Sequence, residues 1–444
     1  MPLKVAIVGS GISGLAAAHA LANQAEVTLF EAGSYFGGHT HTVDVTLPTR
    51  QGPVTHGVDT GFLVLNERTY PNLLKLFADL GVVTAKSDMS FSVQAFDRVH
   101  ERALEWSGCN LNTVFAQRSN LLNRRFWGML RDLLRFNVLT TRIALDGTEA
   151  ELAQPLGDFL QQHRFGSAFC DWYFLPMMAC IWSCPTAQML QFPVSTMVRF
   201  CHNHGLLQIT NRPQWWTVQG GARQYVEKIT ARIQDKRLNT PVRRIEAVSA
   251  TPTQGAGVRL SLDGGQELFD KVIIATHSNQ ALAMLATPTR LERSTLGAIR
   301  TQPNRAVLHT DVSVLPKRQA AWAAWNYERA PASVKENARV CLHYLINRLQ
   351  PLPWQQPVLV SLNPARDIDP AKILGEFDYA HPVFDQAAVE AQAQMPLFQG
   401  QQNRYYAGAW MGYGFHEDGL KAGLAAARQV LADAAAATAA GAAA

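Results

Sequence analysis

The chain has 444 residues, of which 47% are hydrophobic, 17% charged and 9% aromatic, and 40 basic against 35 acidic residues give it a formal net charge of +5. Because this length exceeds what a single compact core accommodates, we expect two domains or an interleaved pair. The mild charge, with no dense block of lysine and arginine, excludes nucleic acid as the expected partner.

The first predicted elements form a βαβ unit. Residues 4–8 ("KVAIV") are typical of a buried parallel strand, 12–23 of a helix and 26–32 of a second strand. The unit spans roughly 30 residues, which suits a crossover connection. Its apolar start runs directly into a glycine turn, unlike a signal peptide, and no apolar stretch of the chain approaches the ~20 residues that span a bilayer. We therefore expect a cytoplasmic protein.

The junction between the first strand and the first helix carries a G-x-G-x-x-G motif. Gly9 permits the tight turn, Gly11 lets the backbone approach a phosphate, and Gly14 lets the helix lie close to the sheet. The helix start, with Ser13 in its first turn, offers free N–H groups to a pyrophosphate. Glu31, twenty residues after Gly11, is placed to accept hydrogen bonds from a ribose. The motif predicts a dinucleotide site; the alternative is a glycine-rich turn without a ligand.

The later elements follow in chain order. Residues 55–66 predict a strand, and 70–81 predict a helix that ends at Gly81. From about 86 to 205 helical spacing dominates, and Trp, Phe, Met and Arg become frequent. The rest of the chain predicts a helix from 221, a strand at 240–248, a hairpin at 257–269, a strand at 271–276, a mixed proline-rich region at 297–395, and a final strand, glycine turn and helix from 403.

The segment 120–137 predicts an amphipathic helix. Three arginines form one stripe of its helical wheel, and large apolar residues cover the opposite side: Arg124, Arg131 and Arg135 against Leu122, Phe126, Met129, Leu130, Leu133 and Leu134. Two interpretations stay open: a surface helix packed on the core, or a helix in peripheral contact with an anionic membrane.

Aromatic and methionine side chains gather between residues 160 and 216. Such a set more often forms a hydrophobic core. A pocket for a hydrophobic ligand requires the same residue types, so this region is also the expected pocket wall.

Five segments together resemble the superfamily of flavin-containing amine oxidases and carotenoid (phytoene) desaturases. "AGSYFGGHTHTV" (32–43) resembles the glycine pair that lies along the FAD pyrophosphate, although Tyr35 and His39 stand where that family usually has arginine. "YYAGAWMGYGFHEDGLKAGLAAA" (405–427) resembles the closing flavin motif of the family. The other three segments are "WTVQGGARQYV" (216–226), "TPVRRI" (240–245) and "IIAT" (273–276). Together with "DTGFLVLN", the pattern is most similar to bacterial FAD-dependent oxidoreductases encoded beside cyclopropane fatty acid synthase-like genes.

The resemblance implies an α/β fold with two interleaved domains. A Rossmann-type FAD-binding domain of the amine oxidase type would comprise residues 1–85, 206–290 and 396–444. An α+β substrate-binding domain with a helical cap would comprise residues 86–205 and 291–395.

The resemblance also implies a non-covalent FAD and its site. The closing motif contains no cysteine for a flavin thioether. A second helix start near residue 416 would stabilise negative charge on the reduced flavin. The implied cofactor-binding residues are Gly9, Gly11, Ser13, Gly14, Glu31, Gly37, Gly38, His39, Thr40, Gly61, Val242, Ala275, Gly408 and His416. The implied catalytic residues are Trp410, Tyr413, Phe415 and His416, and no metal site is expected because the histidine spacings suit no closed zinc site.

The implied reaction moves a hydride from a C–H bond of a hydrophobic substrate to flavin N5. The implied substrate class is fatty-acyl, lipid or isoprenoid. Three alternatives stay open: an amine oxidase, which Phe415 at an aromatic-cage position disfavours, a fatty-acid isomerase with no net redox change, and a structural flavin.

Overall fold

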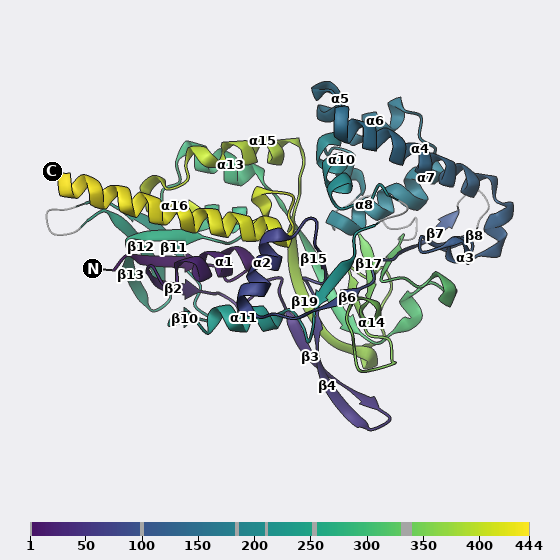
Figure 1. Cartoon of the computed structure of the whole chain (residues 1–444), viewed down its shortest axis with the longest axis horizontal. Helices are drawn as coiled ribbons and strands as arrows, with labels where there is room; N and C mark the ends of the chain where they lie inside the picture. The colour runs from purple at the N-terminus through teal and green to yellow at the C-terminus, as the bar shows by residue number, and fades with distance from the viewer. Residues whose placement is uncertain are drawn as a thin grey trace.

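The computed structural model describes residues 2–97, 102–182, 186–208, 212–250, 255–329 and 340–443. The molecule is elongated and has two parts (Figure 1). One part contains both chain ends and a parallel sheet, and the other contains a second sheet with a cluster of helices beside it. The α/β architecture expected from the sequence is confirmed.

A five-stranded parallel sheet forms the first part, with the strand order β10–β2–β1–β14–β20. Successive side chains of β1 enter different cores: Val5 and Ile7 pack on one face, Ala6 and Val8 on the other. This is the pattern of a sheet that is buried on both faces. Its strands come from distant stretches of the chain: Lys4–Val8 (β1), Glu26–Phe30 (β2), Asp235–Arg237 (β10), Lys271–Ile274 (β14) and Arg404–Tyr406 (β20). The exact domain ranges stay a prediction.

Helices and a small antiparallel sheet cover the two faces of the parallel sheet. One face packs against α1 (Ile12–Leu21), α2 (Pro71–Leu80), α11 (Arg223–Thr230) and α16 (His416–Ala443). As predicted, α2 ends at Gly81, whose φ is +61°. The other face packs against β11 (Arg244–Val248), β12 (Gly257–Leu262), β13 (Gly265–Phe269), α12 (Ser278–Met284), α13 (Arg290–Ala298) and α15 (Gln386–Gln394).

A seven-stranded sheet forms the second part, with the order β19–β15–β18–β17–β16–β7–β8. All neighbours are antiparallel except β16 and β7. Its strands are Phe91–Asp97 (β7), Arg102–Ser107 (β8), Thr301–His309 (β15), Trp325–Glu328 (β16), Cys341–Leu345 (β17), Leu359–Leu362 (β18) and Ile373–Pro382 (β19), and the short α14 is Ile346–Leu349.

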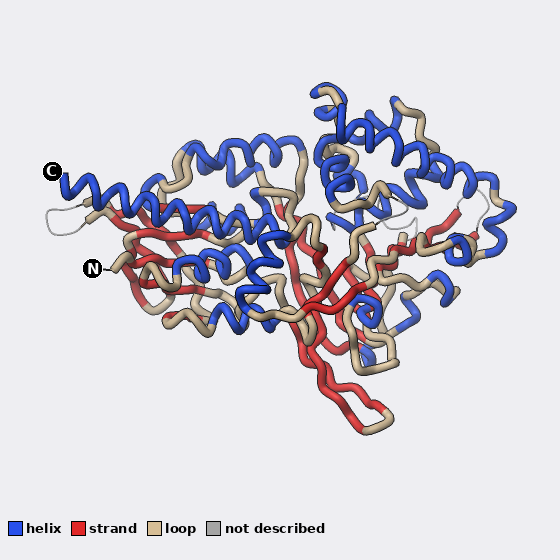
Figure 2. Tube along the Cα trace, in the orientation of Figure 1, coloured by secondary structure: helices blue, strands red, loops and turns tan. Residues whose placement is uncertain are grey.

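Helices between residues 111 and 203 gather beside this second sheet (Figure 2). Many of the aromatic residues noted in the sequence fill their core, where Phe136 contacts the rings of Phe159, Phe169 and Phe174. No helix within the described residues is both long enough and apolar enough to cross a bilayer. The helices are Leu111–Val114 (α3), Arg124–Asp146 (α4), Glu149–Ala153 (α5), Leu156–Gln162 (α6), Ser167–Phe169 (α7), Leu175–Trp182 (α8), Thr186–Met189 (α9) and Val194–Asn203 (α10).

The helix expected at 120–137 is α4, which begins at Arg124 and continues to Asp146. It buries Phe126 and Met129 as expected. Leu122 and Leu134 do not pack on the core with them, because they are 90% and 53% exposed. Leu122 precedes the first residue of α4, so a helical wheel does not describe where its side chain points. Leu134 lies within α4, on the face that is turned to solvent.

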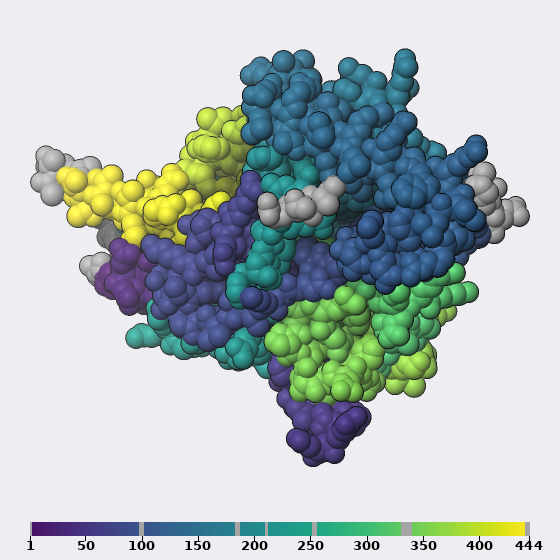
Figure 3. All heavy atoms as spheres, turned by 45° about the vertical axis from the view of Figure 1, so that its right-hand side comes forward, coloured from purple at the N-terminus to yellow at the C-terminus, as the bar shows by residue number. Residues whose placement is uncertain are grey.

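A long hairpin projects from the body of the molecule (Figure 1, Figure 3). It consists of β3 (Thr42–Thr49) and β4 (Gly52–Asp59). The single strand expected at 55–66 is therefore wrong: β4 ends at Asp59, and β5 (Leu65–Asn66) pairs with β9 (Trp215–Val218) in another sheet, which β6 (Thr84–Ser87) completes. The hairpin directs its base, and not its tip, towards the parallel sheet.

Candidate active site

The first glycine loop leaves an open space at the start of α1. Gly9 has φ +99°, and a Cβ there would lie 2.7 Å from the Ala275 carbonyl oxygen. A Cβ on Gly14 would lie 1.9 Å from the Gly9 carbonyl oxygen, so these two positions exclude a side chain. A Cβ on Gly11, in contrast, would meet no heavy atom within 4 Å, and no side chain caps the helix start. Backbone N–H groups at a helix start that have no capping side chain, and that face an open space, can bind a diphosphate.

The start of α16 lies against the start of α1. A Cβ on Gly419 would lie 2.7 Å from Ile12 Cγ2, and one on Gly423 would lie 2.0 Å from the Ser13 carbonyl oxygen. Glycine at both positions therefore lets the two helices touch. Ser13, an expected cofactor-binding residue, lies at this contact. The closing helix thereby brings its own N-terminal positive partial charge next to that of α1.

A second glycine loop follows the end of β2. Gly38 has φ +59°, and a Cβ there would lie 3.1 Å from Gly11 Cα, so the two loops are in contact. Gly37 has φ +124° and donates its N–H to the Ser10 carbonyl oxygen at 3.1 Å. The structure thus brings together the two glycine motifs that the sequence places 23 or more residues apart.

His39 ends this loop and carries a buried ring nitrogen, Nε2, that lacks a hydrogen-bond partner. Its ring packs at 5.1 Å from Tyr379 and 5.2 Å from His381. Burial, and next the charge that His381 can carry, hold the pKa of His39 well below its usual value, so the ring is neutral. An unpaired buried polar atom beside the glycine loops fits a site completed by a polar ligand.

Glu31 stands at the end of β2, as expected, and its carboxylate is engaged by the protein. Oε2 accepts the backbone N–H of Ser10 at 2.9 Å and the Ser10 hydroxyl at 2.5 Å, and Oε1 accepts the N–H of Gly33 at 2.8 Å. These bonds fix the carboxylate beside the first glycine loop. A contact with ribose stays a prediction.

The segment between β20 and α16, residues 407–415, is called the closing loop here, and one carboxylate holds it in place. Asp418 Oδ2 accepts the backbone N–H of Tyr413 at 3.1 Å and that of Phe415 at 3.0 Å. Burial raises the pKa of Asp418 to about 6. The ring of Phe415 stacks on Phe200 at 4.5 Å and lies 6.4 Å from Trp182. Phe415 therefore belongs to an aromatic wall with Phe200 and Trp182, and the backbone of Tyr413, which was also expected at the catalytic end, is fixed beside it by Asp418 and by the Trp182 indole N–H at 3.3 Å.

Trp410, another expected catalytic residue, is buried away from that wall. Its indole N–H donates to the Thr276 carbonyl oxygen at 3.0 Å, and its exposed fraction is 2%. A Cβ on Gly408 would lie 2.1 Å from the Trp410 indole nitrogen, so this glycine makes room for the indole. The indole joins the closing loop to the end of β14. In the structure the Trp410 side chain holds the closing loop in place. A catalytic role for Trp410 stays a prediction.

His416 is the first residue of α16, and its side chain points into the protein. Nε2 lies 2.6 Å from the Tyr225 hydroxyl and 3.5 Å from Thr40 Oγ1, and the ring stacks on Phe62 at 3.8 Å. Burial lowers the pKa of His416 to about 3. The imidazole is therefore neutral at ordinary pH, and the backbone of residue 416 supplies the helix start.

Three further residues that the resemblance assigned to the cofactor site are Gly61, Ala275 and Val242. Gly61 and Ala275 contact residues of the glycine loops or of β1, and Val242 lies in the core. Gly61 packs against His39, whose carbonyl oxygen would lie 2.2 Å from a Cβ on the glycine. Ala275 donates its N–H to the Val8 carbonyl oxygen at 2.8 Å. Val242 is buried in the core below the sheet; the strand expected at 240–248 begins only at Arg244, so Val242 lies in the preceding loop.

Sequence reasoning missed three residues that shape the site. Tyr225 anchors His416 from α11, and Asp59 accepts the Ala222 N–H at the start of that helix at 2.9 Å. Burial raises the pKa of Asp59 to about 7. Arg68 lies at the mouth of the cavity described next. The sequence did contain a signal for Asp59. It is the only carboxylate in the segment "THGVD" and stands just before a turn, and an acidic residue at the end of an apolar strand is a candidate for a functional site.

A cavity of about 250 Å³ opens beside the closing loop. Phe415, His204 and Tyr70 supply its aromatic wall, and Arg68 and Lys421 supply its cations. Burial lowers the pKa of His204 to about 4, so that ring is neutral. The remaining lining residues are Thr69, Pro71, Asn203, Tyr413, Glu417 and Asp418.

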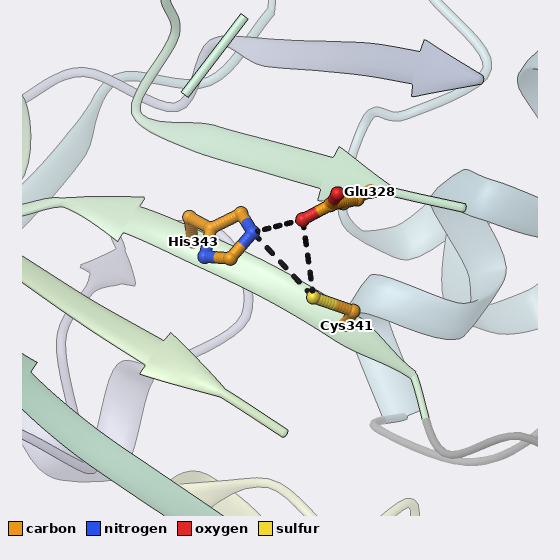
Figure 4. Close-up of side chains that lie close together, drawn as sticks. All are labelled: Glu328, Cys341 and His343. Atoms are coloured by element: carbon orange, nitrogen blue, oxygen red, sulfur yellow. Dashed lines mark hydrogen bonds and ion pairs between the residues drawn. The ribbon is translucent and has the colours of Figure 1, made fainter. Parts of the chain in front are cut away.

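A second cluster of reactive side chains lies on the seven-stranded sheet (Figure 4). Among the described residues, only Glu328, Cys341 and His343 bring three metal-ligand atoms together, within 4.8 Å of one another. His343 Nε2 lies 3.0 Å from Glu328 Oε2, and Cys341 Sγ accepts the Ala365 N–H at 3.3 Å.

Hydrogen bonds account for this cluster without a cation. The Asp311 N–H donates to His309 Nδ1 at 3.0 Å, so the proton of His309 is on Nε2 and points to Ser361 Oγ at 2.7 Å. The Ser361 hydroxyl then donates to His343 Nδ1 at 2.7 Å, which leaves the His343 proton on Nε2, facing Glu328. A protonated nitrogen is not a metal ligand. The cluster is a buried hydrogen-bonded chain.

We expect His343→Ala to destabilise the protein by about 3 kcal/mol, because it leaves Glu328 and Ser361 with unmet hydrogen bonds in a buried position. Glu328→Gln keeps an acceptor for the His343 proton and should cost about 1 kcal/mol. Urea unfolding of both variants checks this. A wild-type unfolding midpoint that drops after dialysis against EDTA would instead show a bound metal.

Comparisons with known proteins identify the family and the fold. The family model described as flavin containing amine oxidoreductase matches residues 12–318, and a search of curated protein sequences returned no match. Among solved structures, cyclohexylamine oxidase from Brevibacterium oxydans IH-35A has a TM-score of 0.66 at 15% identity, covering 98% of this chain and 99% of its own. A CLA-producing fatty acid isomerase from P. acnes has a TM-score of 0.64 at 14% identity, covering 97% and 98%. A putative protoporphyrinogen oxidase from Exiguobacterium sp. 255-15 has a TM-score of 0.59 at 16% identity, covering 96% and 98%.

At these identities the solved structures show the shared fold, and the family model covers more than half of the chain. The open space at Gly11, the two adjoining helix starts and the unpaired His39 nitrogen fit a bound dinucleotide. The chain therefore belongs to the flavin-containing amine oxidoreductase family, and its cofactor is FAD.

Proposed function

We propose that this FAD-dependent oxidoreductase acts on a hydrophobic substrate with an acidic end, of the fatty-acyl class. The observation that carries the proposal is the charge at the cavity mouth. Within the described part of the chain no carboxylate pairs with Arg68, and Lys421 has only Glu417 at 3.9 Å. An apolar wall with cations at its rim suits a chain that ends in a carboxylate.

The carboxylates of the same cavity are engaged by backbone groups. Glu417 accepts the N–H groups of Asn72 and Leu73, both at 3.0 Å. Asp418 accepts the N–H groups of the closing loop. Neither is free to bind a protonated amine. The rim therefore favours an anionic substrate over a cationic one.

FAD supplies the hydride acceptor for such a reaction. The protein's own part is to orient the substrate and exclude water. The stacked rings of Phe415 and Phe200, with Trp182 behind them, give a rigid apolar surface along which an acyl chain can lie. The neutral His204 adds no charge to that surface.

A fatty-acid isomerase with no net redox change is the second candidate. The same cavity could bind a fatty acid for isomerisation as well as for oxidation, and one of the similar solved structures is a fatty acid isomerase. An amine oxidase is the third candidate, supported by the cyclohexylamine oxidase neighbour and opposed by the basic rim. Product analysis separates the first two: an isomerase turns over without an electron acceptor, whereas a dehydrogenase needs one.

The test is an anaerobic titration of the yellow holoprotein with a long-chain fatty acid, its methyl ester, an isoprenoid hydrocarbon and putrescine. We expect the fatty acid to bleach the oxidised-flavin spectrum, or to isomerise without bleaching. Arg68→Gln with Lys421→Gln should raise the KM for the acid about 10- to 100-fold, because each removes a charged hydrogen bond. The methyl ester should be unaffected by the variant.

Lys75→Gln is the matched control, because Lys75 is exposed on the nearby α2. It should leave the KM for the acid unchanged. Bleaching by putrescine alone, or an unchanged KM in the Arg68/Lys421 variant, contradicts the proposed substrate class.

A further inference from the structure

Helix α4 turns an apolar stripe to the solvent. Trp127, Leu134, Val138 and Leu145 are 49%, 53%, 75% and 65% exposed. Their spacings of seven, four and seven residues place them within about 20° of one line along the helix. The opposite face is the buried one, with Phe126, Met129, Phe136 and Ile143 in the core.

The stripe continues beyond the start of the helix. Leu121 and Leu122, in the 3-10 turn Arg118–Leu122, are 47% and 90% exposed. The Trp127 indole N–H donates to the Leu121 carbonyl oxygen at 2.9 Å, and its ring lies 5.3 Å from Phe115. These contacts fix the turn against the helix. Six large apolar side chains thus share one rigid surface, which is unusual for a surface that faces only water.

Arginines line one flank of the stripe. Arg124, Arg131, Arg135 and Arg142 lie about 40–80° around the helix from it. Arg131 is 79% exposed, and its nearest carboxylate is Asp132 at 3.8 Å. Arg124 is exposed as well. Arg135 donates to the His163 carbonyl oxygen and Arg142 pairs with Glu151, so Arg124 and Arg131 are the two cations most available to a partner.

We propose that α4 and the turn before it dock this protein on membranes that contain anionic phospholipids. The charges complement lipid phosphates, and the aligned apolar side chains match the depth of ~5–10 Å to which an interfacial helix enters a bilayer. The stripe lies on a helix of the cluster remote from the parallel sheet (Figure 1), so docking leaves the FAD site free. The proposal does not depend on the substrate.

The membrane suits this surface better than a second copy of the chain does. Antiparallel pairing of two such helices would place the arginine flanks side by side, where like charges repel. A lipid surface instead neutralises the flank and covers the whole stripe. An oligomer held by this stripe is therefore an outcome that contradicts docking on lipid.

Flotation of the holoprotein with vesicles tests the proposal. We expect co-flotation with mixed phosphatidylcholine and phosphatidylglycerol, and at least tenfold weaker binding to phosphatidylcholine alone. Leu134→Ser with Val138→Ser should weaken binding to the mixed vesicles more than tenfold. Arg124→Gln with Arg131→Gln should weaken it about 20-fold and reduce its salt dependence.

Matched controls lie elsewhere on the surface. Leu268→Ser with Leu397→Ser changes two exposed leucines, and Arg290→Gln with Arg293→Gln changes two exposed arginines of α13. Both should float like the wild type. An unaltered flavin spectrum in every variant shows that the fold is intact.

Three flotation results overturn the proposal, and so does one result from light scattering. They are an absence of flotation with the mixed vesicles, equal binding to both vesicle types, and equal binding by the stripe variant and its control. A fourth is a wild-type dimer in light scattering that the stripe variant converts to a monomer, since the stripe would then be covered by a second copy.

Discussion

Gly11→Ala is expected to yield a folded protein that has lost most of its FAD. The backbone angles of Gly11, φ −62° and ψ 177°, suit any residue, and the added methyl group meets no atom of the protein within 4 Å. That methyl group would occupy the space of the cofactor diphosphate. Overpacking by one carbon costs about 1–3 kcal/mol, so FAD affinity should fall roughly tenfold to hundredfold. FAD titration of the apoprotein measures the affinity, and circular dichroism reports the fold.

Gly14→Ala is the contrasting variant at the same loop. Its methyl group would lie 1.9 Å from the Gly9 carbonyl oxygen, so the loop itself must move. This variant should lose stability together with FAD. Should Gly11→Ala bind FAD as tightly as the wild type, the assignment of this loop to the diphosphate is wrong.

Acid is expected to unfold this protein steeply below about pH 6. Burial lowers the pKa of His204, His309 and His381 to about 4 and that of His416 to about 3. An unfolded histidine has a pKa of about 6.5, so the unfolded chain takes up these protons first and stability falls as the pH drops.

Two aspartates oppose this trend. Burial raises the pKa of Asp59 to about 7 and that of Asp418 to about 6, so the folded protein takes up their protons first and is favoured as the pH drops towards about 4. The four histidines exceed the two aspartates by about two protons. The pKa values of His39 and His343, which burial also lowers, add to this excess, so we expect a loss of at least about 3 kcal/mol for each pH unit between about 6 and 4.5.

Urea unfolding at a series of pH values measures this slope. His204→Phe is the matched variant, because phenylalanine can keep the stack on Phe200, whose rings are 3.9 Å apart in the wild type. It should reduce the slope by about 1.4 kcal/mol per pH unit. A free energy of unfolding that stays constant from about pH 7 to pH 5 would contradict the burial of these histidines as neutral rings.

The glycines allowed the cofactor end of the site to be predicted from the sequence. Gly9 and Gly14 lie within one G-x-G-x-x-G motif and Gly419 lies within the closing motif, so the motifs mark positions that exclude a side chain, although the atoms approached at Gly9 and Gly419 belong to distant segments. The helix ended by Gly81 and the first βαβ unit were predictable for the same reason.

The substrate end could not be predicted in the same way. Arg68 reaches the cavity of Lys421 only because α2 and α16 pack together, and no spacing in the sequence shows that contact. Leu134 was assigned to the side opposite the arginines, although on the helical wheel it lies only about 60–100° from them. Which side of α4 is buried is in turn decided by the neighbouring helices. The inward direction of the His416 ring likewise depends on Tyr225, from another helix.

The contact between α1 and α16 has a consequence for biosynthesis. The two helix starts are about 400 residues apart in the chain, and β20, the last strand of the parallel sheet, is made just before α16. A nascent chain therefore cannot complete the pocket for its prosthetic group before α16 has been made, whatever its N-terminal half has already formed. Insertion of FAD must follow the synthesis of α16, so cells short of riboflavin should accumulate a protease-sensitive apoprotein.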